Sequence, residues 1–152
     1  MGISAKEMSK RLHRLANEKT LKILVEAEIA ENEEKLIAIK KDEYEQGDIY
    51  SKGVRRTYAW KAYREEKLFL NPRADGFVDL IYGGGFIAGF ELTRKGNGYT
   101  FFSTDWKNKI LGDKYNNSVS NIFDLDKDVF NDFINKYVKQ GFIKALKEQL
   151  GQ

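Results

Sequence analysis

The stretch from residue 77 to residue 106, FVDLIYGGGFIAGFELTRKGNGYTFFSTDW, constrains the fold of this chain more than any other. It contains two apolar, β-type runs on either side of three consecutive glycines, then the turn sequence Lys-Gly-Asn-Gly at residues 95–98 and a third run. Glycine and asparagine adopt the positive φ angles that a tight hairpin turn requires, so the last two runs are predicted to form a hairpin. The predicted strands of this small antiparallel sheet are residues 77–82, 86–94 and 99–104.

Helix-forming patterns occupy the chain before this stretch. Residues 4–46 contain no proline or glycine, and Ser4 followed three residues later by Glu7 is a capping-box signature. Apolar residues recur at helical spacing on both sides of residues 17–20, where their phase slips. We therefore expect a long N-terminal helical region with a break at residues 17–20 and an end at Gly47.

Further helices are predicted around the strands. Residues 55–67 have the pattern of a short helix, and residues 105–116 that of another. A last helix is expected to start at Asp124 or Asp126 and to continue almost to the end of the chain. The predicted fold class is α+β, with a long N-terminal helical region, a small antiparallel β-sheet with a hairpin, and C-terminal helices.

One domain accounts for the whole chain, because 152 residues is close to the usual domain size of about 100–150. No repeat or low-complexity segment divides the sequence. Within residues 1–152 we expect a helical arm at 1–46, a loop and short helix at 47–76, the β-sheet at 77–104 and helices at 105–150.

The composition argues against several kinds of chemistry. The chain has no cysteine, which excludes thiolate catalysis and thiolate metal sites, and its one histidine, His13, leaves few groups for acid–base catalysis. We therefore expect no enzyme activity, no cofactor and no metal.

The net charge of +3 attracts nucleic acid weakly. No apolar run approaches the about 20 residues that span a bilayer, so no membrane contact is expected.

Three glycines open a G-x-G-x-x-A motif that runs from Gly83 to Ala88. A dinucleotide site needs this motif at the start of a helix within a βαβ unit, so that backbone N–H groups meet the pyrophosphate. The residues that follow the glycines are β-like here. We therefore interpret the glycines as a turn or bulge between two strands.

Asp124, Asp126 and Asp128 have the spacing at which a calcium-binding EF-hand loop begins. That loop also requires a glycine at its sixth position and a glutamate at its twelfth, where this chain has Val129 and Asn135. Carboxylates at a helix N-terminus are stabilised by the free N–H groups there, so we interpret these residues as the start of the last helix.

Asp79 and Glu91 lie on neighbouring predicted strands, as the acid pair of a metal-dependent nuclease does. That signature adds a lysine two residues after the second acid, where this chain has Thr93 followed by Arg94. Because the guanidinium has a very high pKa, arginine does not easily replace a catalytic lysine. We assign no catalytic residue, and a nuclease remains the third alternative.

The most basic part of the chain, residues 50–73, also contains several tyrosines and a tryptophan. Basic and aromatic residues together are typical of a nucleic-acid contact surface, although a solvated helix face that packs its aromatic residues on a sheet has the same composition. The residues expected to contact DNA or another negatively charged partner are Lys52, Arg55, Arg56, Lys61 and Arg64.

The second and third predicted strands alternate between apolar and polar residues, so one face of the hairpin is expected to be buried. These strands contain more aromatic residues than that buried face requires. Surplus aromatic side chains often form subunit contacts. The residues expected to contact a neighbouring subunit are Phe86, Phe90, Phe101 and Phe102.

Three segments follow one another in an order that is also found in one family of proteins. They are ENEEKLIAIKKDEYEQG at residues 31–47, VDLIYGGGF at residues 78–86 and FSTDWKNKILGDKYNNSVSNIFDLDKDVF at residues 102–130. In this order they resemble the small virion-morphogenesis proteins of tailed bacteriophages and prophages, especially those of Bacteroidetes hosts, with crAss-like phages among the candidates. Members of that family resemble neck or tail-completion components, the head–tail connectors.

The chain departs from the family pattern at three turns. The family's Thr-Gly-Asp-Phe is Gly-Gly-Gly-Phe at residues 83–86, its Lys-Tyr-Gly ends in Asn116, and its Phe-Gly-Leu contains Asp124. Glycine and asparagine both tolerate the left-handed region, so the changes are compatible with the same fold.

The resemblance implies a structural virion protein that forms a homo-oligomeric ring, joining portal and tail around the DNA channel. It implies portal, neck or tail subunits as partners, DNA in the channel as a further contact, and a location in the virion after assembly in the host bacterial cytoplasm. The alternative function is a small nucleic-acid-binding module, whose affinity would fall steeply with salt.

Overall fold

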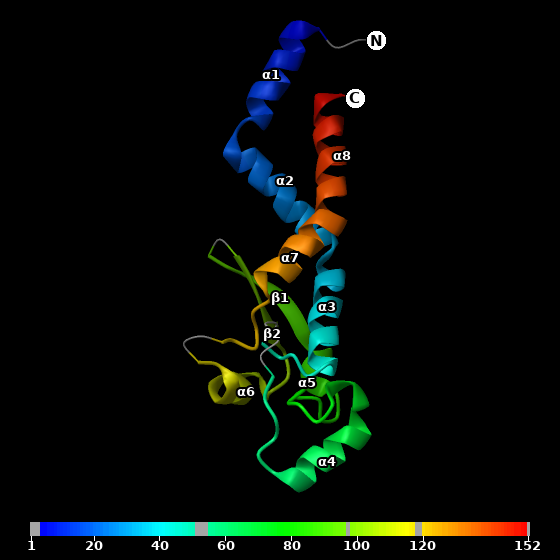
Figure 1. The fold of residues 1–152 in the computed structure, drawn as a ribbon. Helices are drawn as coiled ribbons and strands as arrows, with labels where there is room; N and C mark the ends of the chain where they lie inside the picture. Colours follow the sequence, from blue (N-terminus) through cyan, green and yellow to red (C-terminus); the bar gives the residue numbers. More distant parts are fainter. Residues whose placement is uncertain (1–3, 51–54, 97, 118–119, 152) are drawn as a thin grey trace. The chain divides into compact units, whose positions relative to one another are not determined.

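The computed structural model describes residues 4–50, 55–96, 98–117 and 120–151 (Figure 1). It confirms the α+β class: a helical N-terminal region, a two-stranded antiparallel hairpin and C-terminal helices. The chain divides into two compact units, unit 1 (Met1–Glu34 with Asp128–Gln152) and unit 2 (Lys35–Lys127). This division does not test the expected single domain, which stays a prediction.

Unit 1 begins with two capped helices, α1 (Ala5–Leu15) and α2 (Glu18–Glu31). The Ser4 hydroxyl accepts a hydrogen bond from an N–H of the first turn of α1 at 3.2 Å. Asn17 has extended backbone angles, and its side-chain oxygen accepts from an N–H of α2 at 3.0 Å. The break predicted at residues 17–20 is confirmed, because Asn17 leaves the helix in order to cap the next one. A second break at Asn32 was not predicted.

The C-terminal stretch completes unit 1. It consists of α7 (Lys127–Phe133), which starts directly after Asp126, a π-helical segment η2 (Ile134–Val138) and α8 (Lys139–Leu150). Within unit 1, α8 contacts both α1 and α2.

In unit 2, α3 (Glu33–Glu45) ends in a Schellman motif. The N–H of Gly47 donates to the carbonyl oxygen of Tyr44, and the N–H of Asp48 donates to that of Glu43, both at 2.9 Å. Gly47 has a φ of +75°, which glycine adopts without steric cost. The predicted end of the N-terminal helical region at Gly47 is therefore confirmed.

The hairpin consists of β1 (Phe90–Lys95) and β2 (Gly98–Ser103). Its register runs from the pair Phe90 and Ser103 to the pair Lys95 and Gly98. Gly96 has the positive φ expected of this turn, +61°, and residue 97 lies outside the described residues. The predicted hairpin is confirmed.

The predicted strand at residues 77–82 is wrong. Only Phe77 pairs, in an isolated bridge with Thr57. Beyond it, the Asp79 carboxylate accepts a hydrogen bond from the N–H of Ile81 at 3.0 Å, and Leu80 has a φ of +54°. An aspartate that bonds its own backbone two residues on forms a turn, so this segment cannot continue as a strand.

The predicted strand at residues 86–94 starts late. Its first residues form the single helical turn α5 (Gly85–Ala88), and β1 begins only at Phe90.

The other short helices of unit 2 are α4 (Lys61–Leu70), η1 (Pro72–Ala74) and α6 (Asn108–Tyr115). The helix predicted at 55–67 is thus displaced toward the C-terminus, and the one predicted at 105–116 is found within its bounds.

The core of unit 2 is largely aromatic. The Tyr44 and Phe90 rings meet edge to face at 5.1 Å between centroids, and those of Phe86 and Phe90 do so at 5.2 Å. The Tyr44 hydroxyl donates to the carbonyl oxygen of Ile122 at 2.9 Å, so the buried phenol is satisfied. The buried members of this core are Tyr44, Ile49, Tyr50, Val78, Phe86, Phe90 and Ile122.

Candidate functional site

A buried ion pair anchors the most unusual part of unit 2. The Lys67 ammonium on α4 lies 2.8 Å from an Asp79 oxygen, and the two side chains are 1% and 0% exposed. A charge without a partner is strongly disfavoured at such burial, so each residue requires the other. Lys67 also donates to the carbonyl oxygen of Ile81, which ties the loop to the helix.

Asp79 is fully hydrogen-bonded. The Tyr58 hydroxyl donates to one carboxylate oxygen at 2.9 Å, and the Asn71 side-chain amide donates to the other at 2.9 Å. Burial, and then the negative charge of Asp79, raise the pKa of Tyr58 far above its ordinary value, so its hydroxyl remains a donor. With no solvent access, Asp79 acts here as a structural anchor.

The anchor holds Leu80 in the left-handed region, with a φ of +54°. A non-glycine residue pays on the order of 1–3 kcal/mol for such a conformation and keeps it only where its surroundings fix it. Hydrogen bonds to Asp79 and Ile81, on both sides of Leu80, provide that fixation. The strained residue lines the groove described next.

An open groove with a volume of about 420 Å³ lies beside this anchor. Three segments form it: the residues that lead into α4, the loop after Asp79, and one face of α6. The Tyr58 and Tyr63 rings meet edge to face inside unit 2, with centroids 4.8 Å apart. The groove is lined by Tyr58, Ala59, Trp60, Tyr63, Leu80, Tyr82, Lys107, Leu111, Lys114 and Tyr115. We call it the aromatic groove.

The rim of the aromatic groove combines exposed rings with lysines. Trp60 is 80% exposed and Tyr82 63%. The Lys107 ammonium lies 5.6 Å from the centroid of the Trp106 ring, and that of Lys114 lies 5.3 Å from the Tyr115 ring. Among the described lining residues none is acidic. The groove therefore suits a ligand that has flat or apolar parts and negative charge.

The structure describes four of the five basic residues that the sequence named as contacts. Lys52 lies outside the described residues. The guanidinium of Arg55 lies 5.3 Å from the Phe77 ring, and that of Arg56 lies 5.3 Å from the Tyr50 ring. Both arginines are exposed, so their contact with DNA or another partner stays a prediction.

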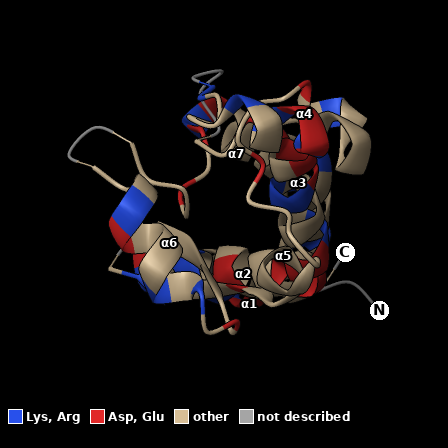
Figure 2. Cartoon of the chain, turned by 90° about the horizontal axis from the view of Figure 1, so that it is seen from below, with Lys and Arg blue, Asp and Glu red and all other residues tan. Residues whose placement is uncertain are grey.

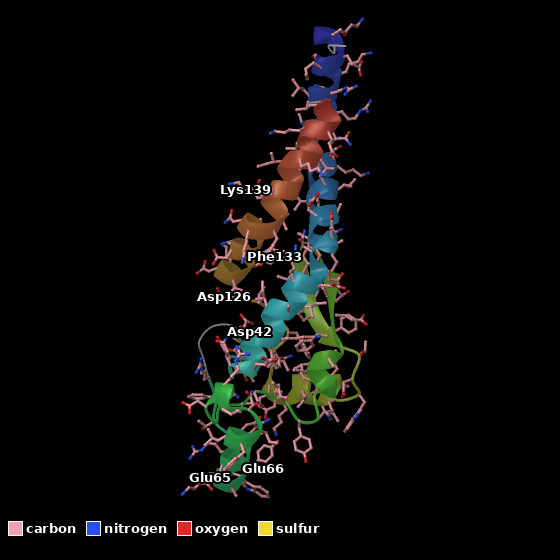
Figure 3. All side chains as sticks on the ribbon, turned by 90° about the vertical axis from the view of Figure 1, so that its right-hand side faces the viewer. Asp42, Glu65, Glu66, Asp126, Phe133 and Lys139 are labelled. Carbon is pink, nitrogen blue, oxygen red and sulfur yellow. The ribbon has the colours of Figure 1, made fainter. Side chains whose placement is uncertain are left out.

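On α4 the positive charges are accompanied by negative ones. Lys61 lies 3.9 Å from Glu65, and Arg64 has its aliphatic stem against Gly76. Exposed Glu65 and Glu66 lie on the same helix (Figure 3). Figure 2 shows lysine or arginine next to aspartate or glutamate along α4, so this helix presents a mixed surface.

Three of the four phenylalanines expected at a subunit contact belong to the core. Phe86, Phe90 and Phe101 are 2%, 4% and 3% exposed. Because their rings are covered within the chain, we assign them to core packing and not to a subunit contact. Phe102 lies opposite Glu91 in the hairpin and is partly exposed, so it alone is available to a neighbour.

The remaining sequence motifs have structural explanations. Asp79 is neutralised by Lys67, while Glu91 is an exposed residue of β1. The glycines at 83–85 do lead into a helix, contrary to the β interpretation, but α5 has four residues and the hairpin follows it. In the described part of the chain no group of three or more His, Cys, Asp or Glu could hold a metal ion.

A second exposed feature of unit 2 is the apolar end of α4. Leu68 is 40% exposed, Phe69 90% and Leu70 58%. These three consecutive large apolar residues face solvent at the end of a helix. Exposed apolar patches commonly mark sites of protein–protein contact. We call these residues the α4 patch.

Sequence reasoning missed the aromatic groove because three distant segments form it. One signal was present: Lys107, Leu111 and Lys114 are spaced by four and three residues, which places them on one helix face. Nothing in the sequence indicated that Tyr58 and Tyr82 would face the same side.

No family model matches this chain, and neither does any curated protein or solved structure. Among the described residues, no helix has the length and apolar character needed to cross a membrane. Function is therefore inferred from the aromatic groove, the α4 patch and the resemblance in sequence.

Proposed function

We propose that this chain is a structural subunit of a tailed-bacteriophage particle, a neck or tail-completion component without enzyme activity. In this role it forms a ring that joins portal and tail around the DNA channel. A ring arises when a head-to-tail contact between copies closes by rotation, which requires two different surfaces on each subunit that are complementary to each other. The order of the three segments at residues 31–47, 78–86 and 102–130 motivates the proposal.

The observation that carries the proposal is the exposure of the α4 patch. Phe69 is 90% exposed, and its neighbours Leu68 and Leu70 are exposed as well. Covering a large apolar side chain in a subunit contact stabilises it by about 1.5–3 kcal/mol. We therefore place one side of the subunit contact at the α4 patch, in place of the core phenylalanines.

The experiment compares incorporation into particles. Quantitative mass spectrometry of purified particles should find the wild-type chain at a fixed copy number, and light scattering gives the mass of the free protein. Phe69→Ser should lower the copy number strongly, since it removes the most exposed side chain of the α4 patch without touching the core. Glu66→Ser, at an exposed polar position of the same helix, serves as the matched control and should incorporate normally.

Two results would contradict the proposal. Absence of the wild-type chain from particles excludes a virion role. Equal incorporation of Phe69→Ser and Glu66→Ser excludes the α4 patch as the contact. Circular dichroism of both variants establishes that they fold.

A further inference from the structure

The aromatic groove has a fixed floor. Tyr58 is held by its hydrogen bond to Asp79, its ring is set edge to face on Tyr63, and the neighbouring Leu80 has a constrained backbone. A site whose side chains are already held in place loses little conformational entropy when a ligand binds. The floor is therefore suited to stacking on a flat ligand.

The rim supplies both open ring faces and positive charges. Trp60 and Tyr82 leave most of their ring surface open to solvent. Lys107 is the N-cap residue of α6 and Lys114 lies in its last turn, seven residues further on and about 10 Å along the helix axis. The two ammonium groups thus reach separate points along one extended ligand.

The chemistry of this groove matches that of single-stranded nucleic acid. Unpaired bases offer flat π faces that stack on tyrosine and tryptophan whatever their sequence, and the phosphates between them carry the negative charge that lysines attract. A duplex hides those faces within its own stacks. An acidic peptide would use the lysines but gains nothing comparable from open aromatic rings.

We propose that the aromatic groove binds the unpaired bases of a single-stranded nucleic acid, with Trp60 and Tyr82 stacking on bases and Lys107 and Lys114 contacting phosphates. This activity goes beyond the proposed virion role and does not depend on it. The cations that contribute lie at the N-cap and in the last turn of α6, outside the basic segment at residues 50–73 that the sequence first suggested.

The test measures fluorescence anisotropy of a labelled oligothymidylate of about twelve nucleotides against the full-length chain, at about 50 and about 200 mM salt. Trp60→Ala should weaken binding by about fivefold or more, since a stacked base contributes at least that much. Phe69→Ala, which removes an exposed ring of α4 that does not line the groove, is the matched control and should bind as the wild type does.

The lysines are tested through the salt dependence. The double variant Lys107→Gln/Lys114→Gln should flatten the plot of log affinity against log salt by about 1.4, the contribution of two phosphate contacts to a single strand. Lys109→Gln removes another exposed lysine of α6, one already paired with Asp113, and should leave the slope unchanged.

Competition identifies the ligand class. A duplex of the same length and poly-glutamate should each compete less well than the unlabelled single strand. Equal competition by duplex or by poly-glutamate, an unchanged slope in the double lysine variant, or no binding at about 50 mM salt would each overturn the proposal. Because Phe69→Ala binds nucleic acid normally but is expected to assemble poorly, failure of either proposal is seen separately.

Discussion

The two units of this protein bury different kinds of group. In unit 1 the described buried side chains are three apolar ones, Ile29, Phe133 and Val138, and the amide of Asn32. Unit 2 has an extensive aromatic core and also buries Lys40, Lys67 and Asp79. Apolar helix faces can pack against many different apolar side chains. A buried charge, by contrast, is stable only where a counter-charge and hydrogen bonds compensate it. We therefore expect single substitutions to cost more in unit 2 than in unit 1.

The largest effect is expected at the buried ion pair of unit 2. Lys67→Met leaves the Asp79 carboxylate buried without its counter-charge, which should lower the free energy of unfolding by about 3–5 kcal/mol. Urea unfolding followed by circular dichroism measures the loss. Amide hydrogen exchange then shows whether protection is lost across residues 35–127.

The double variant Lys67→Met/Asp79→Asn is the control for this prediction. It removes both charges, so it should be less destabilised than Lys67→Met alone, even though the Asn71 amide then faces a less suitable partner. If the double variant loses the sum of two single losses, the pair is not coupled, and the ion pair is not what fixes the loop after residue 79.

Gly47→Ala tests whether the close packing of unit 2 extends to its backbone. The left-handed conformation costs alanine about 1–2 kcal/mol. A Cβ at this position would also lie 2.8 Å from the Cβ of Phe77, a contact that no side-chain rotation relieves. Thermal and urea unfolding should show a loss above the conformational cost alone.

Gly96→Ala is the matched control for Gly47→Ala. Gly96 has a similar φ, +61°, and a Cβ there would meet nothing within 4 Å. The difference between the two variants therefore isolates the steric part. Equal losses of stability in the two variants would mean that the backbone around residue 77 shifts to make room for the new Cβ. Unit 2 would then be less rigidly packed than its buried charges indicate.

Lys40 is the other buried lysine, and it should make the stability of the fold depend on pH. Desolvation lowers its pKa, and the nearby carboxylates of Glu43, Asp48 and Asp124 oppose this only in part. Between the lowered folded-state pKa and the ordinary value of 10.5, the unfolded chain binds more protons than the folded one. Stability attributable to Lys40 should therefore rise with pH in that window, by at most about 1.4 kcal/mol per pH unit.

The measurement compares wild type with Lys40→Met from pH 7 upward by urea unfolding. The stability of the wild type relative to the variant should increase with pH. Tyr44, whose pKa burial raises, acts in the opposite direction, but only near and above its ordinary value of 10, so the comparison ends below that pH. A gap that is constant or shrinks with pH would show that Lys40 stays fully protonated in the folded protein.

Features set by neighbouring residues were predictable from the sequence. The cap at Ser4, the break at Asn17, the helix end at Gly47 and the hairpin turn all depend on chemistry within about four residues. These predictions were confirmed, and with them the α+β class.

Features set by distant partners were not predictable in this way. The apolar run at 77–82 resembles a strand until Asp79 is known to pair with Lys67, twelve residues earlier. The register places Phe90 and Phe101 on one face of the hairpin, and the alternation in the sequence did not indicate that the chain itself covers that face. The aromatic groove joins three segments, so its lining follows only from the tertiary fold.

The smallest effect is expected in unit 1, at Gly141 of α8. A Cβ there would lie 1.8 Å from a carboxylate oxygen of Glu28, which is far too close. That oxygen is the far end of a flexible side chain and can rotate toward solvent, unlike the Phe77 Cβ opposite Gly47. In a helix interior, alanine is also more stabilising than glycine by up to about 1 kcal/mol.

Urea unfolding of Gly141→Ala should therefore show a change in the free energy of unfolding within about 1 kcal/mol, on the stabilising side. Gly141→Ala/Glu28→Ala should show the full gain. A clear loss in both variants would mean that α2 and α8 are fixed as rigidly as the loops of unit 2, and the contrast between the units would then lie in their composition and not in their tolerance.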